Sequence, residues 1–187
     1  MANIVGFVFA LLAILLVPGP TNTLLATSGA TVGWVRSLPL LLCELIGYET
    51  AIVVIRLLMG PVLSRLPNGV RWMHVLAAAY LVVLAVGLWR WRLAQATRAV
   101  RAHQVLITTL LNPKAWLIAL VLIPLPVTDA RYWLVLTPLI PLIGSTWIAF
   151  GRLLRRSGSQ GLTALIPKAA SVTLGAFATI LIVSALR

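Results

Sequence analysis

The sequence predicts an all-α integral membrane protein with six transmembrane helices, built as two inverted three-helix repeats in one domain that covers residues 1–187. Hydrophobic residues make up 61% of the chain and charged residues 10%, with a mean hydropathy of +1.05, whereas a soluble domain is about 25% charged. Apolar runs close to the roughly 20 residues of a spanning helix recur along the chain. Prolines interrupt the first and fourth runs, and matched interruptions in opposed halves are typical of inverted repeats.

The charge balance is strongly basic, with fifteen Lys and Arg residues against three acidic residues and a net charge of +12. A nucleic-acid partner is not expected, because the basic residues lie mostly between apolar runs and no soluble domain carries such a surface. They are predicted to contact membrane lipids and to fix the orientation of the chain. The one cysteine, Cys43, lies within an apolar run, so it cannot form an intramolecular disulfide and is expected to act as a small apolar filler.

The first span is predicted at 4–26 and is broken near its end by two prolines and a glycine. No Lys or Arg precedes its apolar core, so it is read as a spanning helix and not as a signal peptide. A proline break costs about 3 kcal/mol, and in hydrocarbon the freed backbone groups survive only inside protein or beside a wet cavity. We expect the polar residues after the break to cap the N–H groups of the second half, before a polar segment at 27–37. The first candidate substrate-binding residues are Pro18, Gly19, Pro20, Thr21, Asn22 and Thr23.

The second span, predicted at 38–60, carries Glu44, Glu49 and Arg56. An ionisable residue at a helix centre costs about 2.5–3.5 kcal/mol on insertion scales. Glu49 and Arg56 lie two turns apart on nearly one face, and Glu44 shares another face with Tyr48, a further candidate substrate contact. One interpretation is that a glutamate couples transport to protons or binds a cation. The other is structural, with Glu44 reaching the interface from near a helix end and Glu49 neutralised by an arginine.

The third span is predicted at 72–89, after a turn that begins at Pro61 and continues through 67–69. It ends in the Trp-Arg-Trp-Arg cluster 89–92, whose composition is typical of an anchor at the membrane interface. A polar, basic connector at 93–104 follows and is expected to be cytoplasmic.

The fourth span, predicted at 105–123, is interrupted at Asn112, Pro113 and Lys114, the remaining candidate substrate-binding residues. Proline at the start of a half-helix leaves N–H groups free to face an anion, and Lys114 adds a positive charge. The lysine is therefore expected to recognise a carboxylate or to pair with a glutamate of the second span. The alternative is an interfacial lysine whose ammonium reaches the headgroups.

The remaining segments are a turn at 124–131, a fifth span at 132–150, a basic, glycine-rich stretch at 152–167 and a sixth span at 168–186. Both histidines, His74 and His103, lie near span ends and are predicted to be structural. The sequence contains no metal-ligand spacing, and no cofactor is expected.

The orientation follows from the basic residues on each side of the six spans. One side holds nine: Arg36, Arg90, Arg92, Arg98, Arg101, Arg152, Arg155, Arg156 and Lys168. The other side holds four: Arg65, Arg71, Arg131 and Arg187. The positive-inside rule places the larger set in the cytoplasm, so both termini are predicted to be periplasmic, with repeats at about 1–92 and 105–187.

These features together resemble the LysE/RhtB family of small amino-acid exporters. The resemblance rests on Pro18-Gly19-Pro20 with Asn22-Thr23-Leu24-Leu25 and on Leu111-Asn112-Pro113-Lys114-Ala115-Trp116, and with the length and layout it covers essentially the whole chain. It implies export of an amino acid or related small metabolite across the bacterial inner membrane, driven by the proton gradient. The chain departs from the family pattern by interposing Thr21 before the asparagine and by carrying two glutamates in the second span.

The leading hypothesis is therefore a secondary transporter and not an enzyme. Its broken spans would line a central cavity, with half-helix N-termini binding a substrate carboxylate. One alternative is a membrane-embedded enzyme on a lipid-type substrate, for which Glu44, Glu49 and Arg56 form the one available cluster. Another is a non-transporting membrane subunit. Small residues such as Gly29 and Gly33 permit a homodimer.

Overall fold

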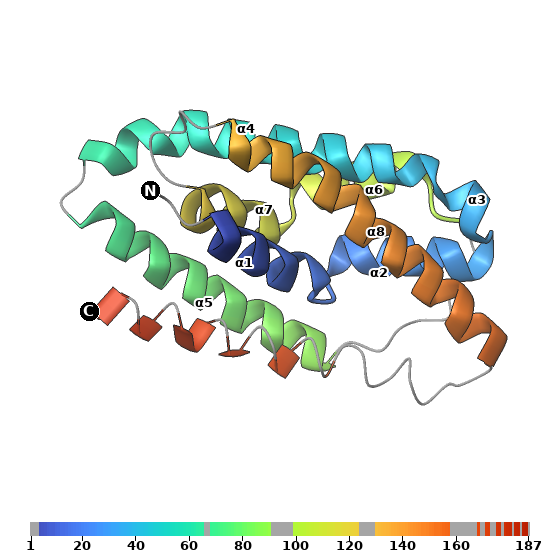
Figure 1. Ribbon diagram of the computed structural model, residues 1–187. Helices are drawn as coiled ribbons and strands as arrows, with labels where there is room; N and C mark the ends of the chain where they lie inside the picture. Colours follow the sequence, from blue (N-terminus) through green and yellow to red (C-terminus); the bar gives the residue numbers. More distant parts are fainter. Residues whose placement is uncertain are drawn as a thin grey trace.

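The computed structural model describes residues 4–65, 68–90, 99–123 and 130–157, together with separate helical positions between 168 and 186. In these ranges the chain forms eight α-helices and one π-helical segment, which confirms the all-α prediction (Figure 1). The elements are α1 (Ile4–Leu16), α2 (Pro20–Thr31), α3 (Trp34–Ser37), α4 (Pro39–Arg65), α5 (Gly69–Arg90), α6 (Ala102–Leu110), α7 (Pro113–Leu117), η1 (Ile118–Leu122) and α8 (Arg131–Ser157).

The described residues include several candidate membrane spans. Two stretches, Trp34–Met59 and Arg131–Arg156, are long and apolar enough to cross a membrane, and the number rises to four when each of two bent helix pairs counts as one span. The chain is thus a membrane protein with two to four candidate spans in its described part. Six spans and an inverted repeat stay predictions, and seven of the 19 residues of the sixth predicted span and half of the 93–104 connector lie outside the described residues.

Both predicted helix breaks are confirmed. The first bent pair joins α1 to α2 at an angle of 60°, and the second joins α6 to α7 and η1 at 41°. The second half of the first pair runs to Thr31, beyond its predicted end at residue 26. Thr31 Oγ1 donates back to the carbonyl oxygens of Thr27 and Ser28, and such local bonds allow a threonine to stay within a helix.

The predicted turn at Pro61 is wrong. Pro61 lies inside α4, which continues to Arg65, and Pro138 and Pro141 likewise lie inside α8. A single proline removes one backbone donor, and a long helix with many other bonds can continue past it. At the first break Gly19 stands between Pro18 and Pro20 with an extended backbone, φ −155° and ψ 178°, and the helix is interrupted there.

Helices α2 and α8 pack with their backbones in contact. A Cβ added to Gly29 would collide with the backbone of α8, and a Cβ added to Gly151 would collide with the backbone of α2. Small residues allow this kind of close helix approach in membranes. Arg155 strengthens the contact, because its Nη1 donates to the Ala30 and Thr31 carbonyl oxygens at 2.7 and 3.0 Å, at the negative end of α2.

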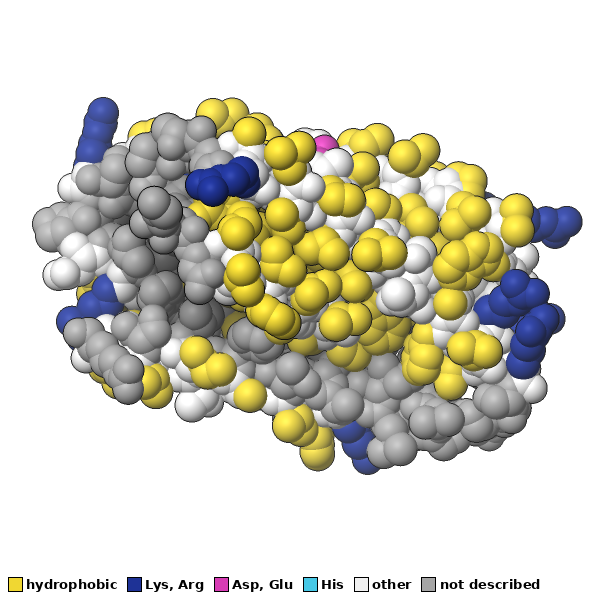
Figure 2. Space-filling view, in the orientation of Figure 1, with side chains coloured by type: hydrophobic (Ala, Val, Ile, Leu, Met, Phe, Trp, Pro, Cys, Tyr) yellow, Lys and Arg dark blue, Asp and Glu magenta, His cyan; other side chains and the backbone are white. Residues whose placement is uncertain are grey.

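The short helices α1 and α7 are seen between α4 and α5 (Figure 1), and α7 contacts both of these long helices. The edge of one aromatic ring meets the face of another where α1 meets α8, with the Phe7 and Tyr132 ring centroids 4.8 Å apart. On the outside, large apolar side chains such as Phe9, Leu57 and Leu134 are exposed. Figure 2 shows hydrophobic side chains covering the middle of the visible face, with Lys and Arg gathered mainly toward its ends, the distribution that a surrounding bilayer requires.

Candidate functional site

The two helix breaks contact each other through buried polar side chains. Thr21, at the start of α2, lies with its Oγ1 3.1 Å from the Oγ1 of Thr109 in α6. Asn112, between α6 and α7, donates from Nδ2 to the same Thr21 oxygen at 2.9 Å. All three residues are buried, so the breaks, 91 residues apart in sequence, meet inside the bundle.

Asn112 joins three helices at this junction. Its Oδ1 accepts a hydrogen bond from the backbone N–H of Lys114 at 3.0 Å, which makes it the N-cap of α7. Its Nδ2 donates to Thr21 Oγ1 and also to the hydroxyl oxygen of Tyr48 in α4 at 3.1 Å. Both amide protons and the carbonyl oxygen are therefore engaged. Asn112 fixes the relative position of α2, α4 and α7.

Lys114 reaches from the second break to the first. Its Nζ donates to the carbonyl oxygen of Leu15 at 3.2 Å and to that of Val17. In an unbroken helix these carbonyls would accept from N–H groups four residues further on, but Pro18 and Pro20 interrupt that pattern. The ammonium also lies at the negative end of the α1 dipole. Lys114 is 4% exposed, so the alternative of an interfacial lysine is wrong.

Asn22 satisfies the same two carbonyls from within α2. Its Nδ2 donates to the Leu15 oxygen at 2.8 Å and to the Val17 oxygen at 2.9 Å. The end of α1 therefore receives donors from both sides, one set from the following helix and one from the second break. A buried carbonyl without a donor would cost about 1–3 kcal/mol, and these contacts remove that penalty.

The expectation that the residues after the break cap the N–H groups of α2 is wrong. The N-cap position is Gly19, which has no side-chain cap. Thr23 Oγ1 donates to the Gly19 carbonyl oxygen at 2.9 Å, Asn22 donates to α1, and Thr21 contacts the second break. These side chains bond to carbonyl oxygens and to another side chain. The break leaves the last carbonyls of α1 without backbone donors, just as it leaves the first N–H groups of α2 without backbone acceptors.

Gly19 provides the space through which Lys114 passes. A Cβ on Gly19 would lie 3.1 Å from Lys114 Cε and 3.4 Å from Nζ. The backbone there is extended, with φ −155° and ψ 178°, a conformation open to any residue. The glycine is thus favoured by the close approach of the lysine, whose side chain would have to shift by a few tenths of an ångström to admit a Cβ, and not by its backbone angles.

Glu44 is the buried acid of the site. It is 2% exposed, and its Oε2 has no hydrogen-bond partner. Gly144 of α8 lies against this oxygen, since a Cβ there would collide with it. Lys114 acts on Glu44 electrostatically, and Tyr48 is buried on the same face, as predicted. Glu44 lies in the second turn of α4, near a helix end as the alternative expected, but its side chain is buried, so the expectation that it reaches the interface is wrong.

Glu49 and Arg56 contact other elements. Glu49 is half-buried, and its Oε1 accepts from Thr137 Oγ1 of α8 at 2.6 Å. Arg56 Nη1 donates to the carbonyl oxygens of Ala119 and Ile123 at 2.5 and 2.9 Å. Arg56 therefore supplies donors where η1 ends, as Lys114 does where α1 ends.

The sequence interpretation missed three members of the site. The Thr109 hydroxyl is hydrogen-bonded to that of Thr21. Gly144 leaves room for the Glu44 carboxylate. Gly47 leaves room for Thr109, whose Cβ would be 2.7 Å from a Cβ at that glycine. Two threonines just before the Asn-Pro pair were the one available signal for Thr109. The glycines had no local signal, because their role depends on which helix lies opposite.

Comparison with known proteins does not assign a family or a function to this site. No family model, no curated protein and no solved structure matched the chain. Within the described part of the chain, no three His, Cys, Asp or Glu side chains gather in a way that could hold a metal ion. The chain is an all-α membrane protein in which two helix breaks form a buried polar junction beside an unpartnered carboxylate.

Proposed function

We propose that the protein is a secondary transporter that exports an amino acid or a related small metabolite across the bacterial inner membrane, coupled to protons. The observation that carries the proposal is the unpartnered carboxylate of Glu44 beside the junction of the two helix breaks. The LysE/RhtB family is the proposed family, on the strength of the two motifs that form the breaks.

A purely structural role does not account for the carboxylate. A buried acceptor without a donor costs about 1–3 kcal/mol, and native structures leave few such atoms. Lys114, the cation that acts on Glu44, directs its hydrogen bonds to the Leu15 and Val17 carbonyls instead. Glu44 Oε2 is therefore free to accept a proton or a donor group of a substrate, and intramembrane acids commonly have this role.

Proton occupancy of Glu44 would affect the first break through Lys114. An ionised Glu44 attracts the ammonium, while a protonated Glu44 does not. The same ammonium donates to the Leu15 and Val17 carbonyls. A change at Glu44 thus changes how firmly the second break holds the end of α1, which is a physical route from a proton to a helix movement.

The free end of α2 is the better of the two half-helix ends for a substrate carboxylate. Its N-cap, Gly19, has no side-chain cap, and the Thr23 N–H is bonded to the Gly19 carbonyl, so the N–H groups of Thr21 and Asn22 are the ones available to an anion at the positive end of the α2 dipole. At the second break, Asn112 already accepts from the first N–H of α7. A zwitterion would place its carboxylate at α2 and its ammonium toward Glu44.

Transport in reconstituted liposomes tests the proposal. Liposomes containing the protein are loaded with a panel of amino acids, and efflux is followed with and without a pH gradient. We expect one chemical class to leave faster with the gradient. We expect Glu44→Gln, which keeps the size of the side chain, to remove the dependence on the gradient, while Glu49→Gln retains it because Glu49 is half-buried and already accepts from Thr137.

Two results would count against the proposal. Absence of efflux for every substrate from correctly folded, monodisperse wild-type protein would exclude this transport activity. Unchanged proton dependence in Glu44→Gln would exclude its coupling role and leave transport itself intact. A metabolite profile of cells lacking the protein identifies the substrate independently, as a solute that accumulates inside.

A further inference from the structure

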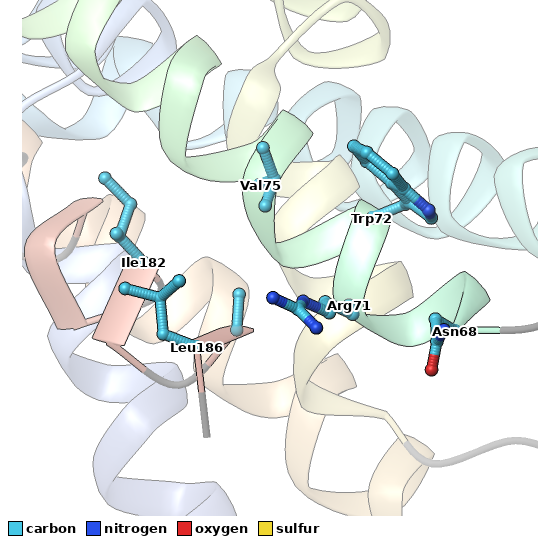
Figure 3. Close-up of a pocket in the computed structure, with 7 residues that line it drawn as sticks. Asn68, Arg71, Trp72, Val75, Ile182 and Leu186 are labelled. Atoms are coloured by element: carbon cyan, nitrogen blue, oxygen red, sulfur yellow. The ribbon is translucent and has the colours of Figure 1, made fainter.

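A pocket of about 370 Å³ lies away from the junction, between the start of α5 and residues near the end of the chain (Figure 3). Of the described residues that line it, Arg71 is the one cation, and most of the others are apolar. The described lining residues include Asn68, Arg71, Trp72, Val75, Ile182 and Leu186.

Arg71 supplies the charge of this pocket. Its side chain extends from α5 toward Leu186, across the opening between the two segments (Figure 3). No residue in the described ranges forms a hydrogen bond or an ion pair with it. A guanidinium has five donors and remains charged throughout the physiological range, so the pocket presents an unused anion-binding group. Asn68, immediately before α5, also lines the pocket, and its side chain extends away from the guanidinium (Figure 3).

The remaining wall is suited to hydrocarbon. Val75, Ile182 and Leu186 are exposed aliphatic side chains on the pocket, and Trp72 is 63% exposed. Arg71 and Trp72 stand in the first turn of α5, a helix of 22 residues, which is long enough to span a bilayer. Trp and Arg at such positions lie at the level of the lipid headgroups, so the polar end of the pocket faces headgroups and its apolar end faces acyl chains.

We propose that this pocket binds an anionic phospholipid. The phosphate would accept hydrogen bonds from Arg71, and an acyl chain would lie along Val75 and Ile182. A guanidinium donates paired hydrogen bonds to a phosphate, whereas a small soluble anion would gain nothing from the aliphatic wall. This proposal does not depend on the proposed transport function, because neither Glu44 nor a helix break takes part.

Native mass spectrometry of the detergent-purified protein tests the assignment with phosphatidylglycerol and phosphatidylcholine supplied at equal concentration. We expect preferential retention of phosphatidylglycerol. Arg71→Gln should weaken that retention about fivefold, the value of one cation near an anionic headgroup, and leave phosphatidylcholine unchanged. Arg65→Gln is the matched control, since it removes an exposed arginine at the same end of α4 and α5 outside the pocket.

Three outcomes would overturn the proposal: equal retention of the two lipids by the wild type, full phosphatidylglycerol retention in Arg71→Gln, or an equal loss in Arg65→Gln. Competition by glycerol phosphate at the affinity of the whole lipid would assign a small-anion site and also overturn it. A test without variants uses the wild type alone, where raising the ammonium acetate concentration should weaken phosphatidylglycerol binding selectively, because salt screens the charge contact.

Discussion

At the scale of single residues, the side chains of the junction provide hydrogen-bond partners for the backbone groups that a helix break leaves unpaired inside a membrane. Water cannot reach such groups in hydrocarbon, so they need protein donors. Asn22 provides donors from the next helix, and Lys114 provides them from the other break. Lys114 is thus a positioning residue for α1 in this conformation, and its third ammonium proton is left for Glu44 or for a substrate.

Replacing Lys114 with methionine tests this role. Lys114→Met keeps the length of the side chain but removes its donors to the Leu15 and Val17 carbonyls, which then depend on Asn22 alone. We expect a loss of about 1–3 kcal/mol, seen as an unfolding midpoint lower by about 2–4 °C for each kcal/mol. Circular dichroism during heating in detergent gives the measurement. The control is Lys168→Met, an exposed lysine 6.0 Å from the Trp89 ring centre, and an equal shift in both variants would contradict the role.

At the scale of elements, glycines decide how closely the helices approach. Gly144 admits the Glu44 carboxylate between α4 and α8, and Gly29 and Gly151 bring α2 and α8 into backbone contact. The position of the buried acid therefore depends on the spacing of α4 and α8 as much as on its own helix.

Enlarging Gly144 should disturb that spacing. Gly144→Ala places a methyl group against the Glu44 carboxylate, so either the carboxylate or α8 must move, at a cost of about 1–3 kcal/mol. The expected result is a lower unfolding midpoint and slower proton-dependent efflux. Gly175→Ala is the matched control, because a Cβ there meets nothing within 4 Å and alanine favours a helix by about 0.5–1 kcal/mol. Equal unfolding midpoints and equal efflux rates for the two variants would show that the close contact at Gly144 does not limit the spacing of α4 and α8.

The elements were predictable from the sequence where the signal was local. The breaks at Pro18 and Pro113 were found because proline acts within one helical turn, whereas the turn expected at Pro61 was wrong because one lost donor did not end a long helix. The polar junction could not be derived in the same way. The bonds of Lys114 to α1 cross 97 and 99 residues of sequence, and their direction depends on how the helices pack.

At the scale of the whole molecule, an apolar surface separates two ends that carry the basic side chains (Figure 2). Arg155 bonds to the end of α2, so the basic end of α8 lies beside α3 and Arg36. The opposite end holds Arg65 and Arg71, where α4 leads into α5. The positive-inside rule still predicts that the α3 end is cytoplasmic.

Cysteine labelling tests this orientation. In a Cys43→Ser background, Arg36→Cys and Arg152→Cys report on one end and Arg65→Cys on the other, and all three arginines are exposed. A membrane-impermeant maleimide added to intact cells should label the Arg65 position alone, and permeabilised cells should label all three. Labelling of the Arg36 and Arg152 positions in intact cells would reverse the predicted orientation.

The glycine contact between α2 and α8 also determines where the bundle can yield. Helices in backbone contact at glycines have no intervening layer of side chains over which to slide. We therefore expect α2 and α8 to move together as one rigid body. A bend would then occur at the short extended link at Gly19. It would require the hydrogen bonds from Thr21 to Thr109 and to Asn112 to break. Any opening of the molecule toward one side of the membrane would begin by breaking the hydrogen bonds among these three residues.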